Sequence, residues 1–200
     1  ILLRTIEQFI SCQQIQEIII AASDADIPFI QQMLLDYSFS VPCKVVKGGS
    51  ERQYSVYNAL QYVSDNTDIV LIHDAARPLV RTGIIRQIIS TAQSFGAAIA
   101  AVPSKNTVKI VEHGLVINTP LRETVWEIHT PQAFRRPILL DAYNHAMEVG
   151  FLGTDDASLL EKIGYPVHVV KDEYSNIKVT TPEDLPLAEA LLHISGGQDD

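Results

Sequence analysis

The stretch DIVLIHDAARP, residues 68–78, joins a run of four apolar residues to a polar cluster. Ile69 to Ile72 shows no alternation of apolar and polar side chains, which is typical of a central parallel strand covered by helices on both faces. In open α/β sheets, ligands bind outside the carboxyl ends of the strands. Asp74 and Arg77 follow at such an end and are candidates for a binding site. Capping of a turn by Asp74 and a structural ion pair with Arg77 would explain them equally well.

Strand and helix patterns alternate on both sides of this stretch. β-Branched runs predict strands at 16–23, 43–50, 97–104, 165–170 and 176–180, and helical periodicity with capping residues predicts helices at about 26–37, 51–63, 82–95, 137–149, 154–164 and 182–193. This alternation predicts βαβ units and an α/β fold with a mostly parallel sheet.

The alternation is interrupted at residues 107–119, where two short strands flank an EHG turn. This pattern predicts a β-hairpin arm at about 106–124, after which residues 120–134 lead back to the body. An isolated hairpin is marginally stable in water, so the arm is expected to pack on the body or on a second subunit.

Length and composition narrow the class of protein. Two hundred residues with 46% hydrophobic content predict one domain, residues 1–193, with a flexible tail at 194–200. The net charge of -9 argues against a nucleic-acid binder, because phosphate-backbone binding needs a surplus of Lys and Arg. The two cysteines suggest neither a disulfide framework nor a zinc site. Without an apolar run of about 18 residues or a signal peptide, we expect no membrane association and a cytoplasmic location.

The segment GGSERQYSV, residues 48–56, places a glycine pair before a predicted helix, for which Ser50 is the expected N-cap. Glycines let the backbone approach a ligand closely, and the helix N-terminus offers free N–H groups and a positive dipole end. Arg52 and Ser55 are three residues apart, so they share a helix face near that end. A glycine-rich turn with a surface arginine is the competing interpretation.

Two further segments, TDDAS (154–158) and SNIKVTTPEDL (175–185), contain helix-start signals. Thr154 as a helix cap is favoured over a carboxylate metal site, and Thr181 followed by Pro182 is typical of an N-cap and first helical position. Lys178 alternates with Ile177 and Val179, so it faces either solvent or a cleft.

Six motifs, GGSERQYSV, HDAARP, VPSKNTVK, HTPQAF, TDDAS and NIKVTTPEDL, occur in an order that resembles the 2-C-methyl-D-erythritol 4-phosphate cytidylyltransferases over residues 1–193. The resemblance implies a Rossmann-like nucleotidyltransferase fold with helices on both faces of the sheet and a protruding arm that joins a homodimer. It also implies CTP, Mg²⁺ and transfer of a cytidylyl group to the sugar-alcohol phosphate in non-mevalonate isoprenoid synthesis. Ribitol 5-phosphate cytidylyltransferases share most of these motifs, but the two alanines of HDAARP favour the methylerythritol branch.

The resemblance also implies roles for individual residues. The residues matched to the nucleotide site are Gly48, Gly49, Arg52, Ser55, Asp74 and Ala75. Those matched to the sugar phosphate are Asp74, Arg77, Thr107, Arg122, Thr130, Thr154 and Lys178, with the arm residues reaching into a neighbouring subunit. Lys178 and Arg122 are the catalytic candidates, and Asp74 is the one candidate metal ligand.

This sequence departs from the family pattern in two places. Ser50 stands where relatives often have Asp, which puts one contact near the base in doubt. The family's opening AAGxGxRM…PKQ segment, which wraps the triphosphate, is absent from the 200 residues, and the chain starts in helical periodicity without Met. An inactive nucleotide-binding fragment is therefore an alternative to an active cytidylyltransferase.

Overall fold

A four-stranded sheet with the order β3-β7-β4-β8 forms the centre of the computed structural model, which describes residues 1–195. Strands β3 (Ile69–Ile72), β4 (Ala97–Pro103) and β8 (His168–Lys171) run in one direction, while β7 (Trp126–Arg135) runs against them between β3 and β4. The mostly parallel sheet is thus confirmed. β7 was not predicted as a strand, since residues 120–134 were expected only to lead back from the arm.

Strand β7 is irregular where it passes the middle of β4. Ile99 pairs with Gln132 and Ala101 with Ile128, so three residues of β7, 129–131, lie opposite Ala100 alone. Such bulges are common next to active sites, where they re-aim side chains. Pro131 lies in this bulge, where its missing N–H group does not interrupt a regular ladder.

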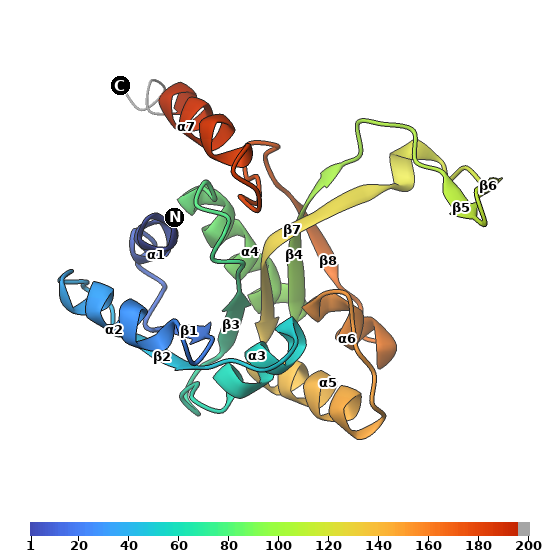
Figure 1. The fold of residues 1–200 in the computed structure, drawn as a ribbon. Helices are drawn as coiled ribbons and strands as arrows, with labels where there is room; N and C mark the ends of the chain where they lie inside the picture. The colour runs from blue at the N-terminus through green and yellow to red at the C-terminus, as the bar shows by residue number, and fades with distance from the viewer. Residues whose placement is uncertain (196–200) are drawn as a thin grey trace.

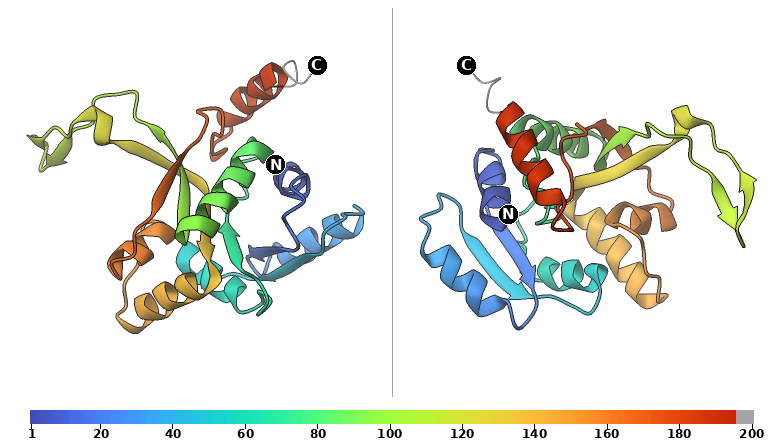
Figure 2. Two further views of the ribbon diagram at one scale, coloured as in Figure 1. Left: turned by 180° about the vertical axis from the view of Figure 1, so that it is seen from behind. Right: turned by 45° about the horizontal axis from the view of Figure 1, so that its top comes forward.

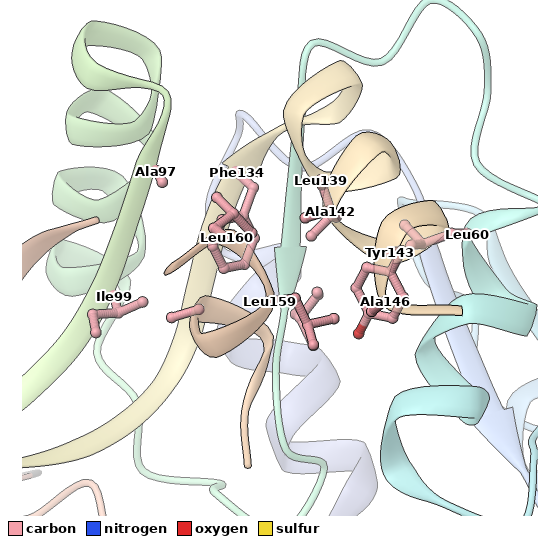
Figure 3. Packing of buried hydrophobic residues seen from close by; sticks show 12 residues of the cluster. Leu60, Ala97, Ile99, Phe134, Leu139, Ala142, Tyr143, Ala146, Leu159 and Leu160 are labelled. Carbon is pink, nitrogen blue, oxygen red and sulfur yellow. The ribbon is translucent and has the colours of Figure 1, made fainter. Parts of the chain in front are cut away.

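Helices cover both faces of the sheet, as predicted (Figure 2). Helix α4 (Thr82–Phe95) packs its isoleucines against small residues of β4 and β7, and the buried cluster there comprises Ile88, Ala92, Ala98, Ala100, Ala133 and Val170. On the other face, α5 (Arg136–Glu148) and α6 (Asp156–Lys162) form a buried cluster of larger residues with the sheet. This cluster includes Ile99 and Phe134 from the sheet, Leu139 and Tyr143 from α5, and Leu159 and Leu160 from α6 (Figure 3). The alternation of β4 side chains between the two clusters fixes which face each helix covers.

The N-terminal third forms a smaller layer beside the sheet (Figure 1). Strands β1 (Ile18–Ala22) and β2 (Cys43–Lys47) pair in parallel, and the segment includes helices α1 (Leu2–Ile10), α2 (Ile27–Leu35) and α3 (Arg52–Leu60). These elements confirm the predicted alternation, although α2 and α3 end two and three residues early.

The predicted arm is present and projects away from the body (Figures 1 and 2). It consists of β5 (Ile110–Glu112), β6 (Leu115–Asn118) and the short 3₁₀ helix η1 (Arg122–Thr124), which leads into β7. The arm's apolar side chains are exposed rather than packed on the body: Ile110, Val111, Leu115, Val116, Ile117 and Leu121.

Two predictions near the C-terminus are wrong. NIKVT (176–180) is a loop instead of a strand, because its backbone bonds to the site rather than to a neighbouring strand: Val179 N donates to Ala76 O. Helix α7 (Asp184–Ser195) begins two residues later than expected, since the Asp184 carboxylate accepts from the Thr181 N–H and thereby closes a turn ahead of the helix. Thr181 is therefore not an N-cap.

Three further boundaries differ from the predictions. Asp155, not Thr154, caps α6, because its side chain accepts the Ser158 N–H in a capping box. Glu51, not Ser50, occupies the N-cap position of α3. The predicted tail overlaps α7 at residues 194 and 195, and residues 196–200 lie outside the described part of the chain.

Candidate functional site

The carboxylate of Asp74 lies just past the end of β3 and has three cationic side chains around it. Lys178 Nζ is 2.9 Å from Oδ2, Arg52 Nε is 3.3 Å from Oδ1, and Arg77 Nε is 3.8 Å from Oδ2. These cations come from the loop after β8, the first residue of α3 and the turn after β3. Segments far apart in the sequence thus converge at one carboxyl end of the sheet.

Burial and charge act in opposite directions on Asp74. Burial alone would raise the pKa of its carboxyl group, but the hydrogen bond from Lys178 and the charge of Arg52 outweigh it, so the pKa is lowered from 3.8. Asp74 is therefore ionised at neutral pH, and its side chain is 14% exposed. An oxyanion that enters the site can compete with Asp74 for the same cations.

Arg52 is held from behind by a second, more deeply buried carboxylate. Its NH2 group lies 2.7 Å from Oδ2 of Asp156, which is 1% exposed. The hydroxyl of Tyr143 donates to the other Asp156 oxygen. Burial opposes the charge on Arg52, but the attraction to Asp156 and Asp74 raises the pKa of the guanidinium above its ordinary value. The cation stays charged, and its direction is set by Asp156.

Thr130, in the bulge of β7, fixes the backbone at Asp74. Its hydroxyl oxygen accepts the Asp74 N–H at 3.0 Å and lies 3.1 Å from Nδ1 of His73. The other ring nitrogen of His73 is 3.1 Å from the Arg77 carbonyl. A neutral imidazole satisfies both contacts, since Nε2–H donates to the carbonyl and Nδ1 accepts from the threonine. Burial lowers the pKa of His73 to about 4.

The loop after β8 is tied to the same residues. The Arg77 guanidinium donates to the Asn176 carbonyl at 2.6 Å, and the Asn176 amide donates to the Thr130 carbonyl at 3.0 Å. Asn176 is 1% exposed. This buried asparagine therefore holds the loop in the position that points Lys178 at Asp74.

A pocket of about 500 Å³ opens at this cluster. Six predicted site residues line it: Arg52, Asp74, Arg77, Thr130, Thr154 and Lys178. The lining also includes Ile99, Ile128, His129, Gln132, Asp155, Ser158 and Glu161. A cavity with several convergent cations is suited to a phosphorylated ligand.

The other nucleotide-site candidates do not line this pocket. Gly48 and Gly49 form a tight loop in which the Gly49 N–H donates to the Ser55 hydroxyl at 2.9 Å. A Cβ atom at Gly49 would lie 2.4 Å from Cβ of Tyr54, so only glycine fits there. Ala75 is not among the lining residues either, and its carbonyl accepts from the hydroxyl of Thr5.

Thr107 and Arg122 lie apart from the pocket in the same chain. Thr107 is exposed in the segment that leads into the arm. Arg122 lines a separate hollow at the base of the arm with Pro103, Ser104, Leu121 and Glu123.

The family model of the 2-C-methyl-D-erythritol 4-phosphate cytidylyltransferases matches residues 1–194. The chain belongs to this family. It is therefore an enzyme of the cytidylyltransferase class, a group of nucleotidyltransferases.

Individual relatives agree with the family assignment. The chain is 44% identical over 194 residues to the 2-C-methyl-D-erythritol 4-phosphate cytidylyltransferase of Bacillus cereus, covering 97% of this chain and 85% of the relative, and 43% identical to that of Caldanaerobacter subterraneus, covering 96% and 86%. The crystal structure of 4-diphosphocytidyl-2C-methyl-D-erythritol synthase from Anaerococcus prevotii superposes with a TM-score of 0.90 at 33% identity, covering 96% of this chain and 88% of that one. The expected Rossmann-like nucleotidyltransferase fold is confirmed by this likeness.

Several residues of this cytidylyltransferase site escaped the sequence analysis. Asp156 was interpreted only as part of a helix start, and Tyr143, Asn176 and the pair His129–Asp172 were not singled out. Sequence spacing does not reveal these contacts, because Tyr143 and Asp156 are 13 residues apart and His129 and Asp172 are 43 residues apart. A sequence motif did surround Asp156 and Asn176, but their burial and partners follow only from the fold.

The described part of this cytidylyltransferase offers few side chains that could coordinate a metal ion. Within residues 1–195, no group of three or more His, Cys, Asp or Glu side chains is arranged to hold a metal. Asp74 fits Mg²⁺ as a single hard oxygen ligand, since Mg²⁺ is commonly held by one or two carboxylates together with substrate phosphates.

Among the described helices, none is long and apolar enough to cross a membrane.

Proposed function

We propose that this protein transfers a cytidylyl group from CTP to 2-C-methyl-D-erythritol 4-phosphate, giving 4-diphosphocytidyl-2-C-methyl-D-erythritol and pyrophosphate in non-mevalonate isoprenoid biosynthesis. The observation that carries the proposal is the cluster of Arg52, Arg77 and Lys178 around Asp74, in a chain that belongs to this family. Ribitol 5-phosphate is the rival acceptor, and the names of the relatives favour methylerythritol phosphate.

The reaction requires positioned cations rather than a nucleophile on the protein. An oxygen of the acceptor phosphate attacks the α-phosphorus of CTP in line, and pyrophosphate leaves from the opposite side. Such transfer depends mainly on orientation and on stabilisation of the charge that develops on the oxygens. We propose that Lys178 and Arg77 bind the acceptor phosphate, while Arg52 remains on its two carboxylates. Lys178 is the more accessible of the two, since its side chain is 44% exposed and that of Arg77 is 11% exposed.

Three further groups complete the proposed nucleotide side. The Gly48–Gly49 loop and Ser55 at the start of α3 would hold the cytosine, because tight glycine backbone admits a flat ring closely. Asp74 would hold Mg²⁺, which when bound would neutralise charge on the phosphates. Ala75, next to Asp74, would contact the ribose.

The arm supports a homodimer. Six apolar side chains are exposed within residues 110–121, and clustered exposed apolar side chains often mark a protein–protein interface. The same arm carries Thr107 and Arg122, which do not reach the pocket of their own chain. We propose that both residues reach the acceptor pocket of the partner subunit.

The function is tested by release of pyrophosphate from CTP and Mg²⁺ with each acceptor in turn. Turnover that is much faster with methylerythritol phosphate than with ribitol 5-phosphate supports the proposal, whereas the opposite preference assigns the protein to the ribitol branch. The inactive alternative is tested by calorimetry, since a chain that binds neither CTP nor the acceptor would be an inactive member of the family.

A further inference from the structure

His129 and Asp172 form a buried pair at the wall of the acceptor pocket. Nδ1 of His129 lies 2.8 Å from Oδ2 of Asp172, and the two side chains are 12% and 1% exposed. His129 belongs to the bulge of β7 and lines the pocket, whereas Asp172 follows β8. Neither residue belongs to the cation cluster around Asp74.

The position of Asp172 is itself fixed. Its Oδ2 atom also accepts from the Asn176 amide at 2.7 Å, and its N–H donates to the Ala101 carbonyl at 2.8 Å. Asn176 is the residue that holds the loop of Lys178. The His129 ring is thus oriented by the same loop that positions Lys178.

The Asp172 carboxylate determines which ring nitrogen of His129 carries the proton and which one can accept a hydrogen bond. A carboxylate oxygen accepts hydrogen bonds, so the imidazole tautomer with its proton on Nδ1 satisfies the contact by donating a hydrogen bond to Asp172. The Nε2 atom then presents a lone pair, and within residues 1–195 no hydrogen bond to Nε2 is formed. His129 is therefore a hydrogen-bond acceptor toward the pocket.

Most hydrogen-bond acceptor atoms that line this pocket are already engaged by other protein groups. The Asp74 oxygens are engaged by cations, the Thr130 hydroxyl is engaged by Asp74 N and His73, and Gln132 is engaged by Asp155 and Ala157. Asp155 and Ser158 are engaged by each other in the capping box of α6. Thr154 and Glu161 are exposed at the rim. A polyol phosphate has several hydroxyl donors besides its phosphate, and lysine and arginine cannot accept from them.

From this geometry we infer that His129 binds the acceptor substrate directly, its Nε2 accepting a hydrogen bond from a hydroxyl of the polyol chain, and that Asp172 is the positioning residue that sets its tautomer. The inference rests on the proposed function, which supplies the polyol phosphate. It separates the recognition of hydroxyl groups by His129 from the recognition of phosphate by Arg77 and Lys178.

The test compares His129→Phe, His129→Gln and Asp172→Asn with His168→Phe as a matched control. His168 lies in β8, stacks on Phe95 and does not line the pocket. KM is measured for CTP and for 2-C-methyl-D-erythritol 4-phosphate at one fixed pH. Butyl phosphate, a phosphate monoester without hydroxyl groups, is the competitive inhibitor that reports on phosphate binding alone.

We expect His129→Phe and Asp172→Asn to raise the KM for the polyol phosphate about tenfold, the effect of one lost hydrogen bond, with the KM for CTP and inhibition by butyl phosphate unchanged. Asp172→Asn acts by donating to Nδ1, which moves the ring proton to Nε2. His129→Gln retains an acceptor oxygen and should lose less affinity, and His168→Phe should change neither constant.

Two results would overturn the inference. Weaker inhibition by butyl phosphate in His129→Phe would show that the ring binds phosphate, and unchanged KM values in both variants would show a purely structural pair. Failure of the proposed function looks different, because the unsubstituted protein would then turn over no polyol phosphate at all. In that case the inference falls with it.

Discussion

The guanidinium of Arg52 bridges two carboxylates of different burial, lying 2.7 Å from Asp156 and 3.3 Å from Asp74. The exposed fraction of the side chain is 1% for Asp156 and 14% for Asp74. Because a buried carboxylate is screened less by water than an exposed one, Asp156 determines where Arg52 points, and Arg52 in turn orients the Asp74 carboxylate that lines the pocket.

Asp156→Asn should therefore weaken both the fold and the catalysis. Loss of one partner leaves Arg52 and the Tyr143 hydroxyl inadequately paired, so we expect the free energy of unfolding in denaturant to fall by about 3 kcal/mol. We expect kcat to fall about tenfold or more, since Arg52 no longer holds Asp74 in place. Asp65→Asn is the control: Asp65 also pairs with an arginine, Arg136 at 2.6 Å, but is 95% exposed and should contribute under about 1 kcal/mol. Equal losses in the two variants would contradict this assignment.

Lys178→Ala should reduce kcat/KM by about 10²- to 10³-fold, as expected for a group that stabilises charge in the transition state. Its half-exposed ion pair with Asp74 contributes little to the fold, so the unfolding midpoint should change little. The charge-matched control is Lys44→Ala, which removes an exposed lysine that lies over the ring of Tyr62. Activity of Lys178→Ala near that of the control would exclude a catalytic role.

Acid should destabilise the fold through His73. Its folded pKa of about 4 lies below its ordinary value of 6.5, so between these values the unfolded state binds more protons and stability is lost as the pH falls. The free energy of unfolding should decrease by about 2 kcal/mol between pH 7 and pH 5, measured by denaturant titration without Mg²⁺. His73→Gln should show a correspondingly smaller loss over the same interval. An identical loss in the variant would place the effect on other groups.

Gly49→Ala should disturb the glycine loop, because the added Cβ would lie 2.4 Å from Cβ of Tyr54. We expect a loss of about 1–3 kcal/mol in stability together with weaker CTP binding by calorimetry. In the control Gly83→Ala, the added Cβ has no atom within 4 Å and lies in helix α4, so it should stabilise by up to about 1 kcal/mol. A tolerated Gly49→Ala with normal CTP affinity would remove this loop from the nucleotide site.

Mixing two inactive variants tests whether the arm acts on the partner. In the proposed homodimer, Arg122→Ala and Lys178→Ala should each disable every site of a dimer built from that variant alone. In a mixed dimer, however, one site combines an intact Lys178 with the intact Arg122 of the other chain. Activity should recover to about a quarter of that of the unsubstituted protein after co-refolding. No recovery, with mixed dimers verified by sedimentation and affinity tags, would place Arg122 in the site of its own chain.

Local patterns predicted regular elements well where the tertiary environment agrees with them. Helix α4 has the predicted bounds of 82–95, since its periodic isoleucines also meet the alanines of β4. Strand β7 was missed because Pro131 and interspersed polar residues are unfavourable signals for a strand. The bulge that accommodates Pro131 depends on β4, so the sequence of β7 alone does not reveal it.

The candidate site was predicted in part for a related reason. Asp74 and Lys178 were expected at the cleft, and they do lie 2.9 Å apart. Lys178, however, reaches it from a loop instead of a strand, because Val179 and Asn176 bond to the turn after β3. The buried partner Asp156 depends on how α5 and α6 pack, which no local pattern reports.

Strand β7 carries the arm at its N-terminal end and pocket residues from Ile128 to Gln132 in its middle. Residues 126–128 pair with β4 and residues 132–135 pair with β3, so the bulge at 129–131 has fixed strand pairs before and after it. The number of residues in β7 consequently sets the distance from the arm to the pocket. One inserted residue in the paired part of β7 would turn Gln132 to the opposite face of the sheet, whereas the turn at His113–Gly114 lies far from any such pairing. An insertion should therefore be tolerated at the arm's tip and not in β7.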